Sequence, residues 1–328
     1  MKEKGNTAAV AAGADKQQIM VKRGEPTLVL PADPTPTEEQ YYLSNLDQNI
    51  AIITQTVYCY KAKVAGDEDD GKGGKKHGDD AAAVIRDALA RPRIPPVISF
   101  DHHEFTEIPN ISDTEALYDT QDLQYRSFCF DPDRLERVRG LALAGGELER
   151  STTFEALSGL VWRARIRALG LAPAQHTKLL FSADGRHRFE PPLPKGYFCN
   201  GIVLTNAIAT ADELVSAPVS RAVALVQGAV RMLTNEYMRS SVDSMDYFEA
   251  TRARPSLAAT LLITTWSKLA FHGADFGWGQ PVMSGPVKLA QKEITLFLSH
   301  GEERKSINVL LGLPATAMDA FQELMDEI

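Results

Sequence analysis

Three absences narrow the possible functions of this 328-residue chain. Lysine and arginine total 35 against 43 aspartates and glutamates, so the net charge of −8 gives no general attraction to nucleic acids or anionic membranes. No apolar run approaches the roughly 18 to 20 residues of a membrane helix, and the polar start lacks the apolar segment of a signal peptide. We therefore expect a cytoplasmic protein with no transmembrane segment and no nucleic-acid partner.

Cysteine is scarce, and the common catalytic motifs are missing. The three cysteines lie far apart without C-x-x-C spacing, which favours packed free thiols over a disulfide framework or a zinc site: Cys59, Cys129 and Cys199. His77 stands beside Asp79 and Asp80 in a polar loop without converging ligands, so we expect no metal site. The sequence has no G-x-S-x-G, G-x-x-x-x-G-K-[ST], dinucleotide fingerprint or H-E-x-x-H.

The composition is that of an ordinary globular chain of about two domains, with 44% hydrophobic, 24% charged and 8% aromatic residues. Residues 1–20 lack periodicity and are expected to form a loose tail. Residues 66–80, GDEDDGKGGKKHGDD, contain no apolar side chain and predict a solvated loop. Three prolines between Pro92 and Pro96 predict an extended linker.

Hydrophobic periodicity predicts a mixed α/β chain without internal repeats. The predicted strands are Thr27–Leu30, Ile50–Tyr60, Lys178–Ala183, Tyr197–Thr205, Leu257–Thr265, Glu293–Ser299 and Ser306–Leu311. The predicted helices are Ala81–Leu89, Thr152–Leu169 with a Thr152-x-x-Glu155 capping box, Pro218–Met238 and Pro314–Met325.

One short motif stands out near the C-terminus. Asp275-Phe276-Gly277-Trp278-Gly279 places two glycines around a large aromatic residue, beside a carboxylate that can accept hydrogen bonds from backbone amides. On physical grounds alone, this pattern predicts a tight structural turn.

The same motif resembles the C-terminal DFGWG signature of the BAHD acyltransferases, plant enzymes that transfer an acyl group from coenzyme A to an alcohol or amine. Other segments look like family blocks in the family's order: LSNLDQ (43–48), TFEAL (153–157), DGR (184–186), PLPKGYF (192–198) and ITTW (263–266). The runs SNLDQNIAII, KLLFSADGR and LSHGEERKSINVLLGLPATAM are similar in particular to members that move feruloyl or caffeoyl groups onto ω-hydroxy fatty acids and fatty alcohols for suberin and waxes. The resemblance covers nearly all of residues 21–328 except the polar loop.

The resemblance implies an α/β fold, the two-domain coenzyme A-dependent acyltransferase fold of mixed sheets with helices. The family's active site lies in a channel between the two domains. In this chain we expect a tail at residues 1–20, a remnant of the N-terminal domain at 21–90, a crossover linker at 91–119 and the C-terminal domain at 120–328.

One departure from the family affects catalysis directly. Members depend on a His-x-x-x-Asp motif, whose histidine takes the proton of the attacking hydroxyl, and no such spacing occurs at any of the seven histidines. About 100 residues, roughly a small domain's core, are missing as one block between Leu89 and Pro92, so the N-terminal domain is expected to be truncated internally. Within the cluster Asp101-His102-His103-Glu104, His103 is four residues before Glu107 and is a weak candidate for a substitute base.

The resemblance also implies roles for residues that remain. Thr264 and Trp266 are candidates to donate hydrogen bonds to the negative charge that develops on the thioester oxygen, although a buried strand end is an equally good interpretation. Arg186 and Arg188 are candidates to bind coenzyme A phosphates. Together with Lys178 and Lys195 they outnumber Asp184 and Glu190, although a solvated charged face explains them as well. By resemblance, Asp275, Phe276, Gly277, Trp278 and Gly279 are structural.

Three hypotheses for function follow. The first is an acyl-CoA-dependent O-acyltransferase that moves a hydroxycinnamoyl group to a long-chain alcohol acceptor, with acyl-CoA as co-substrate and no permanently bound cofactor. The second is a catalytically deficient variant that binds coenzyme A or pairs with full-length protein, and we favour it for this polypeptide. The third is a structural or interaction module. A mis-spliced gene product would also explain the missing block. Family members are usually monomers, whereas unpaired strands in a truncated chain would favour self-association.

Overall fold

The computed structural model describes residues 56–59, 93–193, 201–251, 259–273, 275, 279–281, 283–286, 289, 294–301 and 303–328. The chain divides into two compact units, residues 1–41 and 42–328, and every element described below belongs to the second unit. The tail, the strand predicted at Thr27–Leu30, the polar loop and the helix predicted at Ala81–Leu89 lie outside the described residues.

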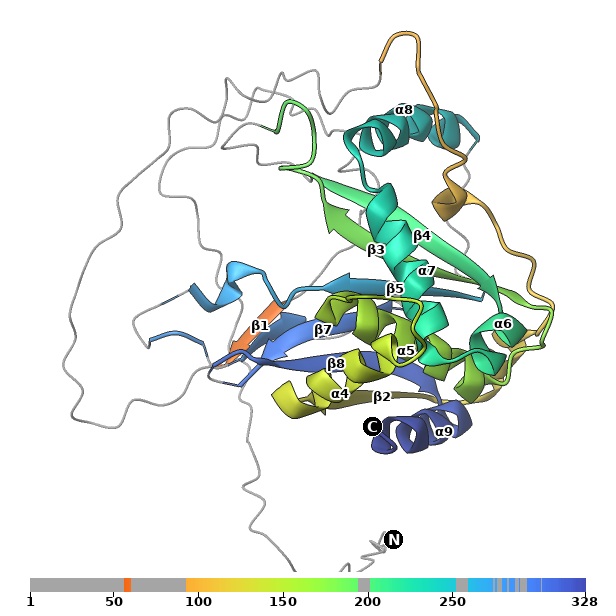
Figure 1. Ribbon diagram of the computed structural model, residues 1–328, viewed down its shortest axis with the longest axis vertical. Helices are drawn as coiled ribbons and strands as arrows, with labels where there is room; N and C mark the ends of the chain where they lie inside the picture. The colour runs from red at the N-terminus through yellow and green to blue at the C-terminus, as the bar shows by residue number, and fades with distance from the viewer. Residues whose placement is uncertain are drawn as a thin grey trace, which may run out of the picture. The chain divides into compact units, whose positions relative to one another are not determined.

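A six-stranded mixed sheet forms the centre of the described fold (Figure 1). Its strands are β2 (Leu123–Phe130), β3 (His176–Asp184), β4 (Ile202–Thr210), β5 (Thr260–Thr265), β7 (Ile294–His300) and β8 (Ser306–Pro314). Their order is β2-β8-β7-β5-β3-β4, in which β5 is parallel to both β3 and β7 and all other neighbours are antiparallel. The carboxyl ends of β3, β5 and β7 therefore meet at one edge, which we call the carboxyl edge.

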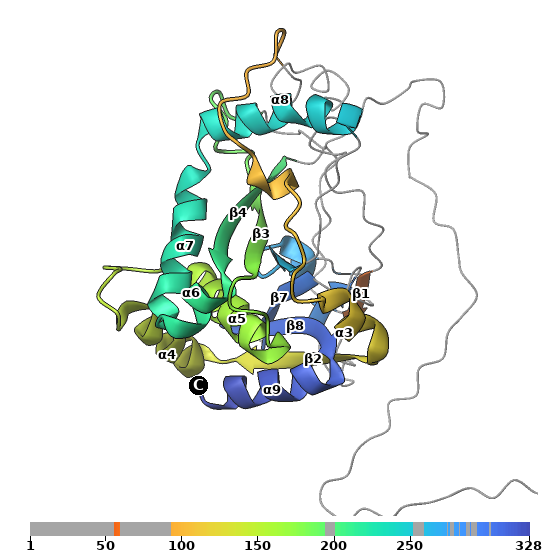
Figure 2. The ribbon, with the colours of Figure 1, turned by 90° about the vertical axis from the view of Figure 1, so that its right-hand side faces the viewer.

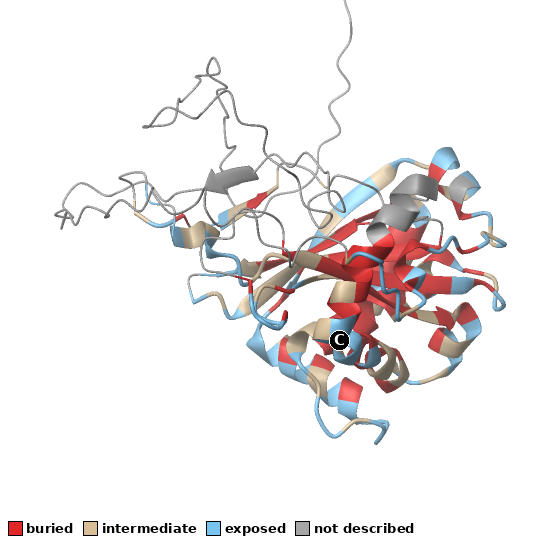
Figure 3. Ribbon diagram, turned by 90° about the horizontal axis from the view of Figure 1, so that it is seen from above, coloured by how far each residue is buried: buried red, intermediate tan, exposed pale blue. Residues whose placement is uncertain are grey.

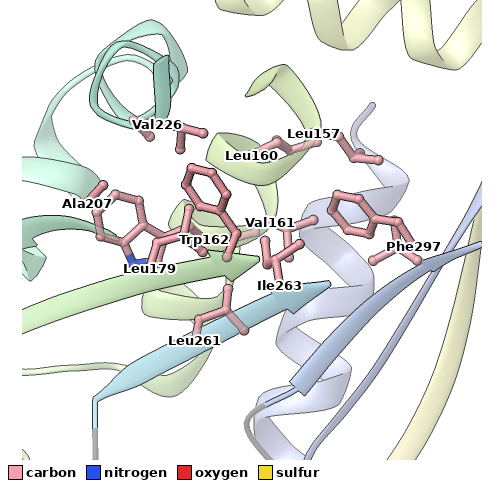
Figure 4. Packing of buried hydrophobic residues seen from close by; sticks show 14 of the residues in the cluster. Leu157, Leu160, Val161, Trp162, Leu179, Ala207, Val226, Leu261, Ile263 and Phe297 are labelled. Carbon is pink, nitrogen blue, oxygen red and sulfur yellow. The ribbon is translucent and has the colours of Figure 1, made fainter. Parts of the chain in front are cut away.

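Helices pack against one face of the sheet, which we call the helical face. They include α4 (Pro132–Leu143), α5 (Thr153–Leu169), α7 (Val219–Met232) and α9 (Ala315–Asp326). Because side chains alternate across a strand, Leu179 of β3, Ile263 of β5 and Phe297 of β7 point into this core, where Trp162 of α5 is fully buried (Figure 4). Buried residues are concentrated in the sheet and its facing helices (Figure 3).

Shorter elements complete the described chain. They are α3 (Thr114–Thr120), α6 (Ala211–Ser216), α8 (Asn235–Thr251), the 3₁₀ turns η2 (His103–Phe105) and η3 (Ala270–Gly273), and a two-stranded antiparallel sheet of β1 (Thr56–Cys59) and β6 (Met283–Pro286). β1 is part of the strand predicted at Ile50–Tyr60, whose remaining residues are outside the described ones. Among the described residues, no helix has the length and apolarity needed to span a membrane.

Most sequence predictions that fall on described residues are confirmed. The Thr152–Glu155 capping box is complete: Thr152 Oγ1 accepts from the Glu155 N–H at 3.2 Å, and Glu155 Oε2 accepts from the Thr152 N–H at 2.8 Å. Strands β3, β5, β7 and β8 and helix α9 also lie where periodicity placed them. The mixed α/β class is therefore confirmed.

Two predictions are wrong. Pro218–Met238 is not one helix, because Thr234 Oγ1 accepts the Tyr237 N–H at 3.2 Å and starts α8 after the end of α7. The strand predicted to end at Thr205 continues to Thr210, where the Thr210 hydroxyl accepts the Glu213 N–H and caps α6. Pairing with all of β3 extends β4, and periodicity within β4 alone does not contain that information.

Helices α5 and α7 approach closely at Gly159, which gives a testable prediction. A Cβ added there would lie 2.8 Å from the backbone nitrogen of Val223, so Gly159→Ala is expected to lower the free energy of unfolding by about 1 to 3 kcal/mol. Gly228→Ala is the matched control, because the exposed Gly228 of α7 has nothing within 4 Å of an added Cβ and should gain about 0.5 to 1 kcal/mol. Urea denaturation of both variants measures the difference. Equal effects would contradict the close packing.

Candidate functional site

Thr264 lies near the carboxyl end of β5, on the face of the sheet opposite the helical face. Its Cα is paired with that of Leu296 on β7, and its Oγ1 lies 3.5 Å from Ser182 Oγ on β3. The preceding residue, Ile263, is fully buried on the helical face, and strand alternation turns Thr264 the other way. Thr264 is half-buried, and its hydroxyl can act as a donor.

Trp266 continues the path of β5 past its last strand residue. Its backbone N–H donates to Phe297 O at 2.8 Å, and its ring is tilted against Phe271 with a centroid separation of 5.4 Å. The indole is half-buried and lines a hollow. Thr264 and Trp266 thus supply two potential donors at the carboxyl edge, with about 7 Å of extended backbone between them.

The carboxyl edge brings the other predicted residues to the same part of the fold. Residues 185–188 follow β3, Thr264 and Trp266 mark the end of β5, and Gly301 follows β7. Ligands of open α/β sheets commonly bind outside the carboxyl ends of parallel strands. The geometry therefore supports a site at this edge, whereas sequence blocks alone could not place the segments together.

The two predicted phosphate-binding arginines are on the surface but already have protein partners. Arg186 Nη1 lies 3.1 Å from Asp184 Oδ1, an ion pair in which the arginine side chain is 34% exposed. Arg188 is exposed, and its Nη1 donates to Leu233 O after the end of α7 at 3.3 Å. A guanidinium has five N–H donors, so the bond from Arg188 to Leu233 O leaves donors of Arg188 for a phosphate.

One of the four residues predicted to form a basic surface patch, Lys178, is not at the surface. Lys178 is fully buried on β3, where its Nζ donates to Thr106 O at 2.5 Å. Lys195 lies outside the described residues. Lys178 therefore cannot contribute to a surface that binds phosphate, and its burial by a segment 72 residues earlier is a tertiary effect that composition does not reveal.

The burial of Lys178 predicts a pH dependence of stability. Desolvation lowers the pKa of Lys178 to about 8, and the nearby Glu104 opposes this shift only in part. Above about pH 8 the unfolded chain, whose lysine pKa is near 10.4, binds more protons than the folded chain. The contribution of Lys178 to the free energy of unfolding therefore rises with pH, by on the order of 3 kcal/mol up to about pH 10.5.

Urea denaturation between pH 7.5 and 9.5 tests this expectation. Lys178→Met should lose the rising contribution relative to wild type, whereas Lys305→Met, at a 69% exposed side chain, should keep it. A wild-type protein whose pH profile matches that of Lys178→Met would contradict the assignment.

The described part of the predicted linker, orange in Figure 2, passes beside β4. Buried side chains of this segment form a polar network near Lys178. Glu104 Oε1 accepts from His102 Nδ1 at 2.7 Å and from the Tyr237 hydroxyl at 2.9 Å, and Glu104 Oε2 accepts from Asn206 Nδ2 at 3.0 Å. His102 Nε2 is 2.7 Å from Ser240 Oγ. All five residues are at most 8% exposed, so the network ties η2 to β4 and α8 and is not open to a substrate.

His103, the substitute base suggested by sequence, does not belong to this network. Its side chain is 55% exposed, and its Nε2 is 3.7 Å from Asp101 Oδ2. Glu107, four residues later, is exposed as well. The histidine with an aligned carboxylate is His102, and sequence spacing gave no reason to choose it over its neighbour.

The DFGWG motif is described only at its two ends. Asp275 Oδ1 accepts from the Gly279 N–H at 2.9 Å, and Gly279 has a φ of 87°, which favours glycine. Phe276, Gly277 and Trp278 lie outside the described residues, and the structural role of the five residues stays a prediction. Among the described residues, no three His, Cys, Asp or Glu side chains are grouped as metal ligands.

Comparison with known proteins identifies the family of this chain. A family profile described as the Transferase family matches residues 74–328. The chain is 58% identical over 238 residues to omega-hydroxypalmitate O-feruloyl transferase of Arabidopsis thaliana, covering 72% of this chain and 51% of that protein. The chain belongs to the BAHD acyltransferase family.

Other BAHD relatives agree. Fatty alcohol:caffeoyl-CoA acyltransferase of Arabidopsis thaliana is 56% identical over 238 residues, covering 73% of this chain and 54% of that protein. Shikimate O-hydroxycinnamoyltransferase of Nicotiana tabacum is 33% identical over 249 residues, covering 72% and 57%. The chain thus spans about half the length of these curated BAHD relatives. BAHD acyltransferases use an acyl-CoA as co-substrate.

Solved structures with little sequence identity share the fold. TRI101 of F. sporotrichioides, complexed with coenzyme A and T-2, has a TM-score of 0.58 at 14% identity, covering 76% of this chain and 58% of that chain. Vinorine synthase has a TM-score of 0.51 at 16% identity, covering 63% and 48%. The predicted acyltransferase fold class is therefore confirmed.

Proposed function

We propose that this chain binds a hydroxycinnamoyl-CoA at the carboxyl edge, and that its lineage transfers the acyl group to a long-chain ω-hydroxy fatty acid or fatty alcohol. One observation carries the proposal: Thr264, Trp266, Arg186 and Arg188 come to the same edge of the sheet. The 58% and 56% identities to a feruloyl and a caffeoyl transferase support the choice of acyl group and acceptor.

In the proposed chemistry, a base removes the proton of the acceptor hydroxyl, and the oxygen attacks the thioester carbonyl directly. Negative charge develops on the carbonyl oxygen, and the Thr264 hydroxyl and Trp266 indole N–H would donate to it. Collapse of this intermediate forms the ester and expels the coenzyme A thiolate, which takes up a proton. Arg186 and Arg188 would hold the anionic phosphates.

We also propose that this polypeptide catalyses the step poorly. The sequence lacks His-x-x-x-Asp, and His103 is an exposed side chain whose partner is Asp101.

The proposed organisation is an N-terminal remnant at residues 21–90, a linker at 91–119 and a C-terminal domain at 120–328. Truncation within the remnant favours self-association, and acyl-CoA use without a membrane-spanning helix in the described part supports a cytoplasmic location.

Calorimetric titration with coenzyme A tests the proposed binding. Arg186→Gln and Arg188→Gln are each expected to weaken binding roughly fivefold to tenfold, because each removes a charge-assisted hydrogen bond to phosphate. Arg126→Gln is the matched control, because Arg126 pairs with Asp319 and lies on β2, the edge strand at the far side of the sheet from β3. Absence of coenzyme A binding, or equal affinities in all variants, would contradict the proposal.

A further inference from the structure

We propose that residues 93–112 form a strap that opens and closes as one unit, and that helix α8 couples this strap to the turn that carries Arg186 and Arg188. The strap is the described part of the linker that precedes α3, and it passes beside α8 in both Figure 1 and Figure 2. Opening of the strap is independent of any ligand. The coupling rests on the proposed function, because it assigns a regulatory device to the proposed coenzyme A site.

Side chains, rather than strand pairing, hold the strap to the rest of the described fold. At one end, the Asp243 carboxylate of α8 accepts hydrogen bonds from the backbone N–H groups of Arg93 and Val97, both at 2.8 Å. Near the other end, Gln175 Oε1 accepts from the Ile111 N–H at 2.7 Å. Among the described residues, the strap belongs to no strand, and the hydrogen bonds that join it to other segments all involve a side chain. Water can replace such partners when the strap detaches, so the sheet need not unfold.

The strap makes few apolar contacts with the main core. Phe105 packs with Leu204 and Leu262 in a small cluster separate from the core between the sheet and the helices, and Ile94 is 98% exposed. His102 has a φ of 46°, a left-handed backbone conformation that is costly for a residue other than glycine. A segment with few buried apolar contacts and local strain opens at a lower free energy than the whole domain unfolds.

Helix α8 provides three buried anchors for the strap. Tyr237, Ser240 and Asp243 follow one another at intervals of three residues, so each is a neighbour of the next on the helix surface. The Tyr237 hydroxyl donates to Glu104 Oε1 at 2.9 Å, and Ser240 Oγ accepts from the Ser99 N–H at 2.9 Å. The three anchors are at most 2% exposed, so they are covered when the strap is closed.

The first turn of α8 also contacts the turn that carries the proposed phosphate-binding arginines. Asn235 Oδ1 accepts from the Glu190 N–H at 2.9 Å, and Arg239 Nη2 donates to Glu190 O at 2.8 Å. Arg188 Nη1 donates to Leu233 O, two residues before α8. A shift of α8 would thus move the strap anchors and the arginine turn together. If a bound phosphate favours the closed arrangement, closure of the strap favours phosphate binding by the same factor.

Hydrogen exchange followed by mass spectrometry on the intact chain tests the opening. Gln175→Ala removes the anchor at one end, and Asp243→Asn weakens the anchor at the other. In a single unit, each variant should speed exchange at both ends of the strap, by roughly fivefold or more, and should change exchange in β3 much less. Gln124→Ala, at an exposed glutamine of β2, is the matched control and should leave the strap unchanged.

Three results would overturn the opening of the strap as a unit. Faster exchange only at the altered end would mean that the two ends open independently. Equal acceleration in β3 would mean that the strap is released only when the sheet unfolds. Unchanged exchange in both variants would mean that these anchors do not hold the strap.

The same measurement with saturating coenzyme A tests the coupling. Coenzyme A should slow exchange throughout the strap by roughly fivefold or more, and Asn235→Ala should remove most of this effect while calorimetry still detects binding. Binding without slower exchange would overturn the coupling and leave the proposed function standing. Absence of binding would overturn the proposed function and the coupling with it, while the strap variants without ligand still decide whether the strap opens as a unit.

Discussion

Purified protein mixed with feruloyl-CoA and 16-hydroxyhexadecanoic acid is expected to release coenzyme A thiol at least 10²-fold to 10⁴-fold more slowly than a BAHD member with an intact His-x-x-x-Asp motif. Loss of a general base typically costs this factor, about 3 to 5.5 kcal/mol of activation free energy. The hydrogen-bond donors proposed at Thr264 and Trp266 would stabilise negative charge on the thioester oxygen, but neither group would accept the proton of the attacking hydroxyl. A thiol reagent that follows free coenzyme A measures the rate.

The His103→Ala variant identifies the source of any residual turnover. Because His103 is 55% exposed and faces Asp101, the substitution should leave the slow rate unchanged. Turnover close to that of an intact relative would overturn the proposed deficiency. If turnover occurs and His103→Ala abolishes it, His103 is the substitute base after all.

Replacement of Glu104 by alanine is expected to lower the free energy of unfolding by about 3 to 5 kcal/mol. The substitution leaves the donors of His102, Tyr237 and Asn206 buried without their acceptor, and it removes the carboxylate that opposes the desolvation of Lys178. Against a typical total of about 5 to 15 kcal/mol, this loss would bring the fold close to its stability limit.

Urea denaturation followed by tryptophan fluorescence measures this loss, because Trp162 is fully buried in the core. Glu107→Ala is the matched control three residues away, since Glu107 is exposed, and it should change stability by less than about 0.5 kcal/mol. Glu104→Gln preserves shape and should lose less than Glu104→Ala. If the Glu104 and Glu107 variants unfold at the same urea concentration, the network does not hold the linker.

Local signals in the sequence were enough for much of the fold. The capping box at Thr152 located the start of α5, and alternating apolar residues located β3, β5, β7 and β8. The sequence also carries a signal for α4, since Asp131 caps its N-terminus and Pro132 occupies its first turn. The break between α7 and α8 was not predicted, because only one polar step, Thr234-Asn235, marks it within an otherwise helical pattern.

The candidate site was predictable only in part. Strand alternation could place Thr264 opposite the core-facing Ile263, but the sheet order that brings β3 beside β5 depends on contacts between distant segments. The same limitation explains Lys178, since its neighbours in sequence gave no sign that the linker would cover it. Local charge counting treats every lysine as exposed. In the folded chain, Lys178 is buried and contacts the linker, where Thr106 O accepts its hydrogen bond and the Glu104 carboxylate lies nearby.

The pairing of β2 with β8 has a consequence for how the protein is made. Phe130 of β2 is paired with Ile307 of β8, so one edge of the sheet stays open until residues 306–314 have left the ribosome. At about 5 to 20 residues per second, the nascent chain carries an exposed β2 for many seconds. Pairing of such distant segments is slow, and an open strand invites association with other chains. Chaperone demand during synthesis should therefore be high, and it should end abruptly once β8 is complete.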